Sequence, residues 1–418
     1  MKVAFLIETF PSTTELAILN QVVALVESGV EVTIFTFNKG HLKNKVIHKK
    51  VFKHSLNIIE LPSPIFSRFK ANWKNVIYVR VSAFSIILRT FLASPKACFR
   101  AILTKKYGEA RKAFKIFYAI QPLINKNYSF DVIHCQFGPL GTWGAILRDL
   151  GFLSGKLVTS FRGYDINDLP SKSKKDIYTF LKQEGDIYTA NTNNTKQNAI
   201  KLGFSDERIK IIPSSINIDE FNYRERTYYK LDAFEIITVA RLTEVKGIEY
   251  AIKAIAILKN DFGFDIIRYR IIGDGELKTS LQRLIDVNRL GDCVILEGYQ
   301  SQETLRDEFY NKAHLFILPS IITSNGNREA QGIVLLEAQA CGIPVVGTNT
   351  GGIPEGILKN KSGFVIPDKD PHAIVEIVRS LIENPSLIKE MGKEGRHFVK
   401  QKFDINSITI KLIQLYKS

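Results

Sequence analysis

The sequence predicts an α/β protein built from two doubly wound domains in series. The chain has 418 residues, which is too long for a single hydrophobic core. Short apolar runs alternate with helical stretches and no hairpin turn separates the runs, as is typical of a parallel sheet wrapped by helices. A polar stretch at 214–233 interrupts this alternation, which then restarts. We therefore predict domains at 1–213 and 234–402, a linker at 214–233, and a terminal helix at 403–418 that packs back on the first domain.

The first domain contains six apolar runs of strand length. One helix is expected near 13–28, after the first run, and another begins at Gly138. The expected strands are 3–7, 30–37, 131–136, 156–161, 186–190 and 208–213.

The second domain repeats the pattern. Its expected strands are 234–240, 269–273, 293–298, 314–320 and 343–348, with helices between them at 247–260, 276–290, 302–311 and 332–341. Ligands of doubly wound sheets bind beyond the carboxyl ends of the strands. Two Rossmann-like domains of this kind would face each other across a cleft, so we expect functional residues in the loops at these strand ends.

Composition excludes several classes of protein. Hydrophobic residues make up 45% and charged residues 24% of the chain, as in globular enzymes rather than disordered chains. The four cysteines lack metal-binding spacing and are expected to be reduced thiols of a cytoplasmic protein. The apolar start is too short for a signal peptide. The most apolar window, 76–93, contains Arg80 and Arg89 and does not make a convincing membrane span.

The net charge of +15 is concentrated in one segment. Residues 41–126 contain eighteen lysines and arginines, interspersed with aromatic residues, and only two acidic residues, Glu60 and Glu109. This combination is typical of a basic amphipathic surface that binds an anionic membrane. A solvated basic face is the alternative. Nucleic acid would be attracted by the same charge, but no nucleic-acid-binding motif accompanies it.

Several strand ends of the second domain carry loops suited to a nucleotide. In ARLTEVKG, Arg241 and Lys246 lie between a strand and a helix, where two cations beside a helix start favour a diphosphate. Gly273 follows the next strand, and Gly298 and Tyr299 follow the third, where backbone groups could contact a base or a sugar. Surface charge and tight turns are the structural alternatives.

The stretch EAQGIVLLE (329–337) places two glutamates around a glycine. We expect Gly332 to open a helix, with Glu329 in the loop before it and Glu337 about a turn and a half inside it. A helix start exposes backbone N–H groups that attract anions. Two surface glutamates flanking a buried helix are the alternative interpretation.

The first domain offers further candidates. Ser12 and Thr13 follow the first strand, where they present hydroxyls or cap a helix. No GxGxxG turn occurs there, which disfavours a dehydrogenase. His134 lies at a strand end beside Gln136 and is a core histidine if it is not functional. Arg162 lies in the strand-end loop SFRGYDI, where turn chemistry is an equal alternative.

The sequence DKD (368–370) resembles the acidic triplet with which some nucleotide-sugar enzymes hold a divalent metal. Asp370 precedes Pro371, however, and this pair is typical of an N-cap followed by proline at the first helical position. We therefore predict no metal site and no cofactor.

These motifs resemble those of the retaining, nucleotide-sugar-dependent glycosyltransferases of the GT-B fold, specifically family 4 of the glycosyl transferases group 1. EAQGIVLLE matches the family's E-x7-E motif, RLTEVKG its R-x4-K diphosphate motif, and TNTGGIPE (348–355) a turn of the same family. The resemblance covers nearly the whole chain and is strongest over 234–367. TFPSTTELAILNQ, HCQFG and SFRGYDI are similar to the branch that builds bacterial exopolysaccharides of the colanic acid and amylovoran type.

The resemblance implies roles for the second-domain residues. Glu337 would bind the ribose hydroxyls of the nucleotide and Glu329 a hydroxyl of the donor sugar. The departing diphosphate would be neutralised by Arg241, Lys246 and the backbone amides of Gly332 and Ile333.

The remaining roles concern the base, the sugar and the acceptor. Tyr299 would lie near the base through its backbone, while residues 11–13, His134 and Arg162 would face the sugar and the acceptor. Gln136 and Arg162 stand where family members often have histidines, and Ser214-Ser215 replaces a glycine turn. These departures leave open which first-domain group touches the donor sugar.

We therefore expect a metal-independent, retaining hexosyltransferase that moves a sugar from a nucleoside diphosphate sugar to a lipid-linked oligosaccharide in surface polysaccharide biosynthesis. Its expected location is the inner face of the bacterial plasma membrane, with an anionic membrane and no nucleic acid as partner. A nucleotide-sugar 2-epimerase and a non-catalytic nucleotide-sugar or membrane-binding protein are the alternatives. The base, the sugar and the linkage are not encoded in these motifs.

Overall fold

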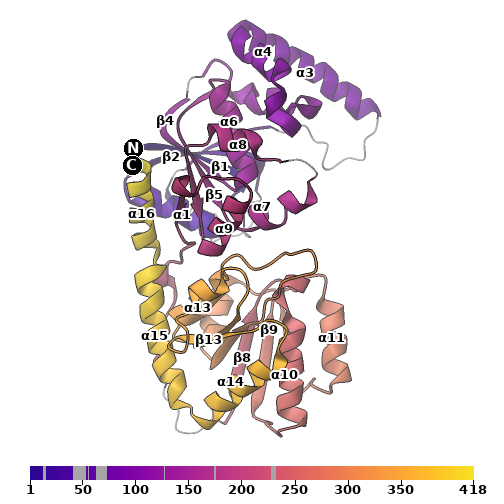
Figure 1. Ribbon diagram of the computed structural model, residues 1–418, viewed down its shortest axis with the longest axis vertical. Helices are drawn as coiled ribbons and strands as arrows, with labels where there is room; N and C mark the ends of the chain where they lie inside the picture. Colours follow the sequence, from indigo (N-terminus) through magenta and orange to yellow (C-terminus); the bar gives the residue numbers. More distant parts are fainter. Residues whose placement is uncertain are drawn as a thin grey trace. The chain divides into compact units, whose positions relative to one another are not determined.

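The computed structural model describes residues 1–12, 16–40, 53–54, 56–62, 73–126, 128–173, 176–226 and 232–418, without the side chains of 73–80 and 113. The chain divides into two compact units (Figure 1). The first unit comprises Met1–Asn191, Lys196–Ile212 and Thr409–Ser418, and the second comprises Thr192–Thr195 and Pro213–Ile408. The predictions for Thr13 and for much of 41–72 lie outside the described residues.

The described part of the first unit contains a seven-stranded sheet whose paired strands are all parallel. The strand order is β3-β2-β1-β4-β5-β6-β7, so the direction of winding reverses between β1 and β4. The strands are β1 (Lys2–Phe10), β2 (Glu31–Lys39), β3 (Asn57–Glu60), β4 (Tyr128–Gln136), β5 (Leu153–Phe161), β6 (Ile187–Ala190) and β7 (Ile209–Ile211).

The central strands of this sheet are buried on both sides, because helices cover both faces. The helices are α1 (Leu16–Glu27), α3 (Trp73–Ala93), α4 (Pro95–Leu103), α5 (Lys115–Ile120), α6 (Gly138–Asp149), α7 (Tyr164–Asn167), α8 (Thr179–Glu184) and α9 (Asn193–Lys201). Short 3-10 turns occur at η2 (Lys105–Phe114), η3 (Gln121–Leu123), η4 (Pro170–Lys172) and η5 (Asp206–Arg208). Among the described residues, no helix is both long enough and apolar enough to cross a membrane.

The helix α6 lies close to the sheet at two of its glycines, Gly141 and Gly144. A Cβ atom on Gly141 would lie 2.5 Å from the side chain of Thr159, and one on Gly144 would lie 2.5 Å from the Sγ atom of Cys135. This close approach places the start of α6 directly beyond the carboxyl ends of β4 and β5.

The second unit has a six-stranded parallel sheet with the order β10-β9-β8-β11-β12-β13. Its strands are β8 (Phe234–Val239), β9 (Ile267–Ile272), β10 (Val294–Gly298), β11 (Leu315–Leu318), β12 (Val345–Thr348) and β13 (Gly363–Ile366). Its helices are α10 (Ile248–Asn260), α11 (Lys278–Val287), α12 (Gln302–Thr304), α13 (Ile333–Ala340), α14 (Pro371–Glu383) and α15 (Ser386–Lys402). A π-helical turn (Leu305–Tyr310) follows α12, and 3-10 turns occur at η6 (Ile218–Glu220), η7 (Glu244–Lys246) and η9 (Ile353–Gly356).

The structure corrects the linker prediction for 214–233. Residues 213–226 belong to the second unit, and Ile216, Ile218 and Phe221 are buried in its core beside α13 and α15. The polar composition of the stretch concealed these three apolar side chains, which are separated by polar neighbours. Residues 227–231 lie outside the described set.

The last helix, α16 (Ile405–Lys417), occupies the range in which a terminal helix was predicted. Its residues from Thr409 onward belong to the first unit. Leu412, Leu415 and Tyr416 are buried in the same hydrophobic cluster as Val3 and Phe5 of β1. The two ends of the chain are therefore parts of one core, and their labels lie side by side in Figure 1.

Candidate active site

The loop after β8 brings Lys246 to Glu329. Gly247 ends η7 with a φ of 58°, and a Cβ atom there would lie 2.1 Å from the carbonyl oxygen of Pro319. Only glycine allows this approach, which joins the loop after β8 to the loop after β11. The ammonium group of Lys246 donates a hydrogen bond to the carboxylate of Glu329, and both side chains are 16% exposed.

The surroundings of Glu329 favour the charged form of its carboxyl group. Burial alone would raise the pKa of Glu329, but Lys246 and the backbone N–H of Ala330 more than offset it, and the net pKa lies below its ordinary value. Arg241, exposed at the end of β8, adds to this lowering. Both cations of the R-x4-K motif thus act electrostatically on the first glutamate of the E-x7-E motif.

The helix α13 starts at Gly332, as the sequence predicts. Gly332 is its N-cap with φ 74° and ψ 59°, and no side chain described in the structure caps the helix start. The positive φ of Gly332 favours glycine, and a Cβ atom there would lie 2.9 Å from the side chain of Leu318, which would have to shift. The backbone N–H groups at Gly332 and Ile333 therefore form an anion-attracting helix start, in the loop that carries Glu329.

The second glutamate of the motif, Glu337, lies inside α13. Its side chain is buried, and its Oε2 atom accepts a hydrogen bond of 2.9 Å from the hydroxyl of Tyr310. Burial raises the pKa of Glu337 to about 7, although Tyr310 and Arg306 act in the opposite direction. Ile333 and Glu337 are four residues apart and so share one face of the helix.

Two arginines that sequence reasoning missed hold the carboxyl end of α13. Arg226 donates hydrogen bonds to the carbonyl oxygens of Cys341 at 2.5 Å and Tyr310 at 2.7 Å. Arg396 donates to the carbonyl oxygen of Ala340 at 2.7 Å. Cations at a helix carboxyl end stabilise its dipole. Neither arginine lies in a recognisable motif, so only the three-dimensional structure identifies them.

The glycines predicted after β9 and β10 pack backbone against backbone. The N–H of Gly273 donates to the carbonyl of Gly298 at 2.8 Å, and a Cβ atom on Gly273 would lie 1.8 Å from the carbonyl oxygen of Ala240. The side chain of Tyr299 is exposed. The structure thus brings Gly273 and Gly298 close to the start of the loop after β8, which carries Arg241, at the carboxyl ends of the strands.

His134 is fully buried in the first unit. Its Nδ1 atom lies 2.5 Å from the hydroxyl of Tyr416, and its Nε2 atom lies 2.7 Å from the hydroxyl of Ser160. Burial, with a contribution from Arg162, lowers the pKa of His134 to about 3, so the ring is neutral. Both ring nitrogens have protein partners, and the structure therefore favours the core-histidine interpretation over a catalytic role.

Arg162 lies in a polar network at the carboxyl ends of β4 and β5. Its Nε atom donates to the amide oxygen of Gln136 at 2.9 Å, and a terminal nitrogen donates to the amide oxygen of Gln21 at 3.2 Å. The buried carboxylate of Asp165 holds this loop by accepting hydrogen bonds from the backbone N–H groups of Gly138, Arg162 and Gly163. Gln21 and Asp165 were not predicted as site residues.

Ser12 is half-buried just beyond β1, and Thr13 lies outside the described residues. The N-cap predicted at Asp370 is confirmed, because its carboxylate accepts a hydrogen bond of 3.1 Å from the backbone N–H of Ala373. Within the described ranges, no group of three or more His, Cys, Asp or Glu side chains is arranged to hold a metal ion.

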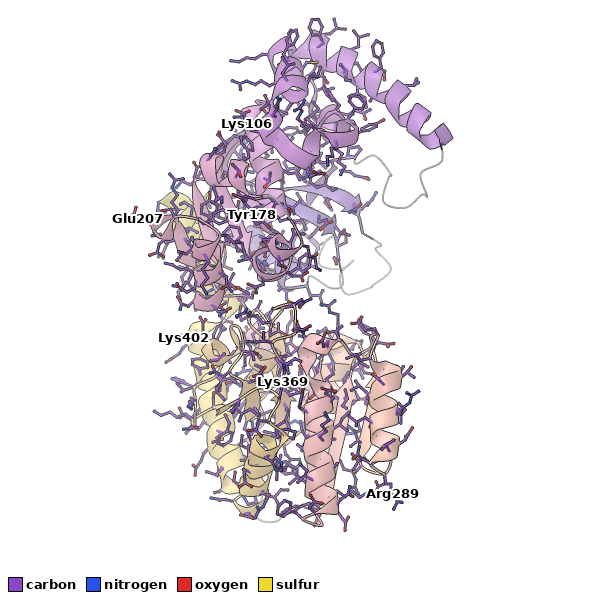
Figure 2. All side chains as sticks on the ribbon, turned by 45° about the vertical axis from the view of Figure 1, so that its right-hand side comes forward. Lys106, Tyr178, Glu207, Arg289, Lys369 and Lys402 are labelled. Carbon is purple, nitrogen blue, oxygen red and sulfur yellow. The ribbon has the colours of Figure 1, made fainter. Side chains whose placement is uncertain are left out.

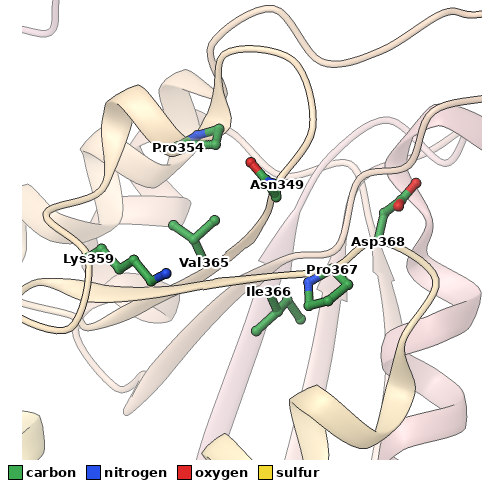
Figure 3. A pocket seen from close by; sticks show the side chains of 7 residues that line it. All are labelled: Asn349, Pro354, Lys359, Val365, Ile366, Pro367 and Asp368. Carbon is green, nitrogen blue, oxygen red and sulfur yellow. The ribbon is translucent and has the colours of Figure 1, made fainter.

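An open pocket of about 680 Å³ lies at the carboxyl ends of β12 and β13 (Figure 3). Its lining mixes polar and apolar groups. The lining residues are Asn349, Pro354, Lys359, Val365, Ile366, Pro367 and Asp368. Asp368 accepts a hydrogen bond of 3.1 Å from the backbone N–H of Ile322 and so helps to position the loop after β11.

Known proteins resemble this chain in sequence and in fold. The family description glycosyl transferases group 1 matches residues 219–398, a range that contains every second-unit candidate. The chain is 30% identical to the putative colanic acid biosynthesis glycosyltransferase WcaL of Escherichia coli K12, over 100% of both chains. It is 30% identical to the amylovoran biosynthesis glycosyltransferase AmsK of Erwinia amylovora, over 97% of this chain and 96% of the other. The structure of Anabaena Alr3699/HepE in complex with UDP has a TM-score of 0.69 and 16% identity, with 100% of both chains covered.

Proposed function

Because the chain belongs to the glycosyl transferases group 1 family and has the GT-B fold, we propose that it is a retaining hexosyltransferase of exopolysaccharide biosynthesis. The donor is a nucleoside diphosphate sugar and the acceptor is a hydroxyl of a lipid-linked oligosaccharide. Its similarity to the colanic acid and amylovoran transferases supports the polysaccharide role. HepE is described in complex with UDP, which supports a nucleotide in the donor.

The observation that carries the proposal is the ion pair of Lys246 and Glu329, in the same loop as the uncapped start of α13. The bond between the anomeric carbon and the diphosphate breaks during transfer, and negative charge develops on the leaving oxygen. A preorganised hydrogen-bond donor at such a position contributes about 3 kcal/mol. Lys246, Arg241 and the amides of Gly332 and Ile333 supply such donors, so we propose that no metal ion takes part.

In this proposal the two glutamates bind different parts of the donor. Glu329 orients Lys246 and accepts a hydrogen bond from a hydroxyl of the donor sugar. Glu337 accepts hydrogen bonds from the ribose hydroxyls, since a carboxylate has the lone pairs for two donors. The acceptor oxygen bonds to the anomeric carbon on the face that the diphosphate leaves. Its proton passes to the departing diphosphate, because both nitrogens of His134 already have protein partners.

The basic segment 41–126 supports a peripheral position at the inner face of the plasma membrane. A lipid-linked acceptor resides in a bilayer, and each lysine or arginine near an anionic surface contributes about 1 kcal/mol. The net charge of the whole chain, +15, is carried by this segment.

The direct test is a ligand screen followed by product analysis. A cognate nucleoside diphosphate at 100 times its dissociation constant should stabilise the protein by about 2.7 kcal/mol, seen as a rise in melting temperature. The cognate donor sugar should then be transferred to an acceptor, and proton NMR of the product should show the anomeric configuration of the donor. An inverted product would contradict retention. Conversion of the donor sugar without any acceptor would instead identify a nucleotide-sugar epimerase.

A further inference from the structure

We propose that the exposed apolar face of α3 and α4 inserts into the acyl-chain region of an anionic bilayer. The proposal rests on the proposed function for the choice of a membrane as partner, and it assigns the contact to particular side chains. We call this surface the insertion face. Its residues are Val81, Phe84, Leu88, Phe91, Leu92, Phe99, Ile102 and Leu103.

These eight exposed apolar side chains are clustered in one part of the chain. Among the described residues, nineteen large apolar side chains are exposed, and eight of them fall within 81–103. Single exposed apolar residues are ordinary on a protein surface, whereas a contiguous apolar patch marks a binding surface.

The insertion face follows the helical repeat of α3. Val81, Phe84, Leu88 and Leu92 recur every three or four residues and therefore lie on one side of the helix. Phe84 is 70% and Leu92 is 75% exposed. The residues Ala83, Ile86 and Thr90, on the other side, are buried against the first unit. Among the described residues, α3 therefore packs through one face, and its second apolar face stays exposed.

The helix α4 extends the same surface. Phe99, Ile102 and Leu103 point outward while Ala97, Cys98 and Ala101 are buried. The rings of Phe91 on α3 and Phe99 on α4 meet edge to face, with centroids 5.8 Å apart. This contact joins the apolar faces of the two helices. Figure 1 draws α3 and α4 at the periphery of the first unit, and in Figure 2 some of the side chains on these helices extend away from the rest of that unit.

Charge argues for an anionic bilayer as the occupant. Residues 81–108 contain five basic side chains and no acidic one, and Arg89, Lys96 and Lys105 are exposed beside the insertion face. A second copy of the chain on the same face would place like charges together, which opposes association. An anionic bilayer accepts the apolar side chains and attracts the basic ones. Since α3 is not apolar enough to cross a membrane, it would lie in the plane of the interface.

Depth of insertion can be measured directly at Leu92. The cysteines at 98, 135, 293 and 341 are buried, so a cysteine introduced as Leu92→Cys can be labelled selectively with an environment-sensitive nitrobenzoxadiazole dye. Vesicles of phosphatidylcholine with about 30% phosphatidylglycerol should shift its emission to the blue and raise its intensity. Val287→Cys on α11, where the native residue is also 75% exposed, is the matched control and should not respond. An equal response at both positions, or none at Leu92→Cys, would overturn the proposal. A blue shift that appears when the protein concentration is raised without vesicles would also overturn it.

A second measurement separates insertion from charge attraction. The triple variant Phe84→Ser/Leu88→Ser/Leu103→Ser should bind these vesicles at least tenfold more weakly, while Phe262→Ser/Val287→Ser should bind as the unaltered protein does. The variant Arg89→Gln/Lys96→Gln/Lys105→Gln should lose the salt-sensitive part of binding. Vesicle affinity unchanged in the apolar triple variant would refute insertion. The melting-temperature shift with nucleoside diphosphate reports on the proposed function independently: vesicle binding without any nucleotide response would contradict that function and leave the insertion face standing.

Discussion

The ion pair between Lys246 and Glu329 leads to the first prediction. Lys246→Ala is expected to reduce the rate of sugar transfer by about a hundredfold, since one preorganised donor to a developing negative charge contributes about 3 kcal/mol. The measurement is the initial rate of nucleoside diphosphate release with donor and acceptor present. Lys253→Ala is the control, because Lys253 pairs with Glu249 on the exposed surface of α10. Sugar transfer by Lys246→Ala at the rate of the unaltered protein would contradict the assignment of Lys246 to the site.

Glu337 gives a pH dependence to donor binding. Its pKa of about 7 means that the carboxylate, the better acceptor for ribose hydroxyls, is lost as pH falls below neutrality. Affinity for the nucleoside diphosphate should therefore decrease by up to about tenfold per pH unit below 7. Calorimetric titrations of the unaltered protein and Glu337→Gln across pH 5.5–8 measure this. The ligand's own titration is common to both proteins, so parallel curves would argue against the assignment.

The same carboxyl group makes a prediction about stability. Its pKa is raised from 4.5 to about 7 in the folded state, so the folded protein binds more protons than the unfolded chain between these values. Glu337 therefore destabilises the fold as pH rises from 4.5 through 7, by about 3 kcal/mol when fully ionised. Urea midpoints should show Glu337→Gln to be more stable than the unaltered protein at pH 8, with the difference vanishing near pH 4.5. A pH-independent difference would contradict the raised pKa.

Sequence reasoning predicted the start of α13 correctly. Gly332 is the N-cap of α13, and Lys246 reaches Glu329 across eighty-three residues of sequence. The partners Tyr310, Arg226 and Arg396 could not be predicted, because each acts on a backbone or carboxyl group far away in sequence and belongs to no local pattern. His134 was a candidate by position alone, and its burial depends on Ser160 and Tyr416, which position could not reveal.

At the scale of the element, α13 is held at both ends by different chemistry. Its start follows a glycine with a positive φ, and its carboxyl end is held by two guanidinium groups. The helix is thus fixed at its carboxyl end, and no described side chain caps its start. Arg226 also holds the carbonyl of Tyr310, whose hydroxyl contacts Glu337.

Arg226→Ala is expected to destabilise the second unit by about 3 kcal/mol, since hydrogen bonds of a charged donor to buried carbonyl groups are lost and the carbonyls stay unsatisfied. Urea unfolding measures the loss. It should also weaken nucleoside diphosphate binding through the displaced helix, with partial recovery in Arg226→Lys. Arg283→Ala on the exposed side of α11 should change stability by less than about 0.5 kcal/mol. A stable Arg226→Ala protein would show that α13 needs no such support.

The strands that the sequence missed, β3 and β13, are edge strands of four residues each. The run in β3 is only half-buried, and β13 begins with a glycine, so neither has the dense apolar signal of the central strands. Long central strands such as β1 and β4 were predicted because burial on both faces demands continuous apolar residues. The predicted helix 302–311 is divided into α12 and a π-helical turn, which periodicity at 3.6 residues does not distinguish.

On the scale of the whole molecule, the restart of the strand and helix pattern predicted two doubly wound units. Composition could not place their boundary, because apolar residues such as Ile216 and Phe221 are diluted by polar neighbours. The return of the chain end to the first unit was predicted together with the terminal helix. The burial of Tyr416 on His134 could be learned only from the structure.

Deletion of residues 409–418 should destabilise the first unit selectively. Leu412, Leu415 and Tyr416 are buried in the hydrophobic cluster that contains Val3 and Phe5 of β1, and the loss of three large side chains corresponds to about 5 kcal/mol or more. Hydrogen exchange should become faster in β1 and β4 and stay unchanged in β11 and β12. Tyr416→Phe should show a smaller loss of about 1–3 kcal/mol, and Ile410→Ala, at an exposed position, should show none. Unaltered protection of β1 in the truncated protein would contradict this packing.

The return of the chain end also has a consequence for synthesis on the ribosome. The strand β1 leaves the ribosome before the second unit, whereas residues 409–418, which share its hydrophobic cluster, leave after that unit. The second unit lies between them in sequence, so all its strands have emerged before the first unit can complete its core. The first unit therefore lacks part of its core until the second unit has been synthesised.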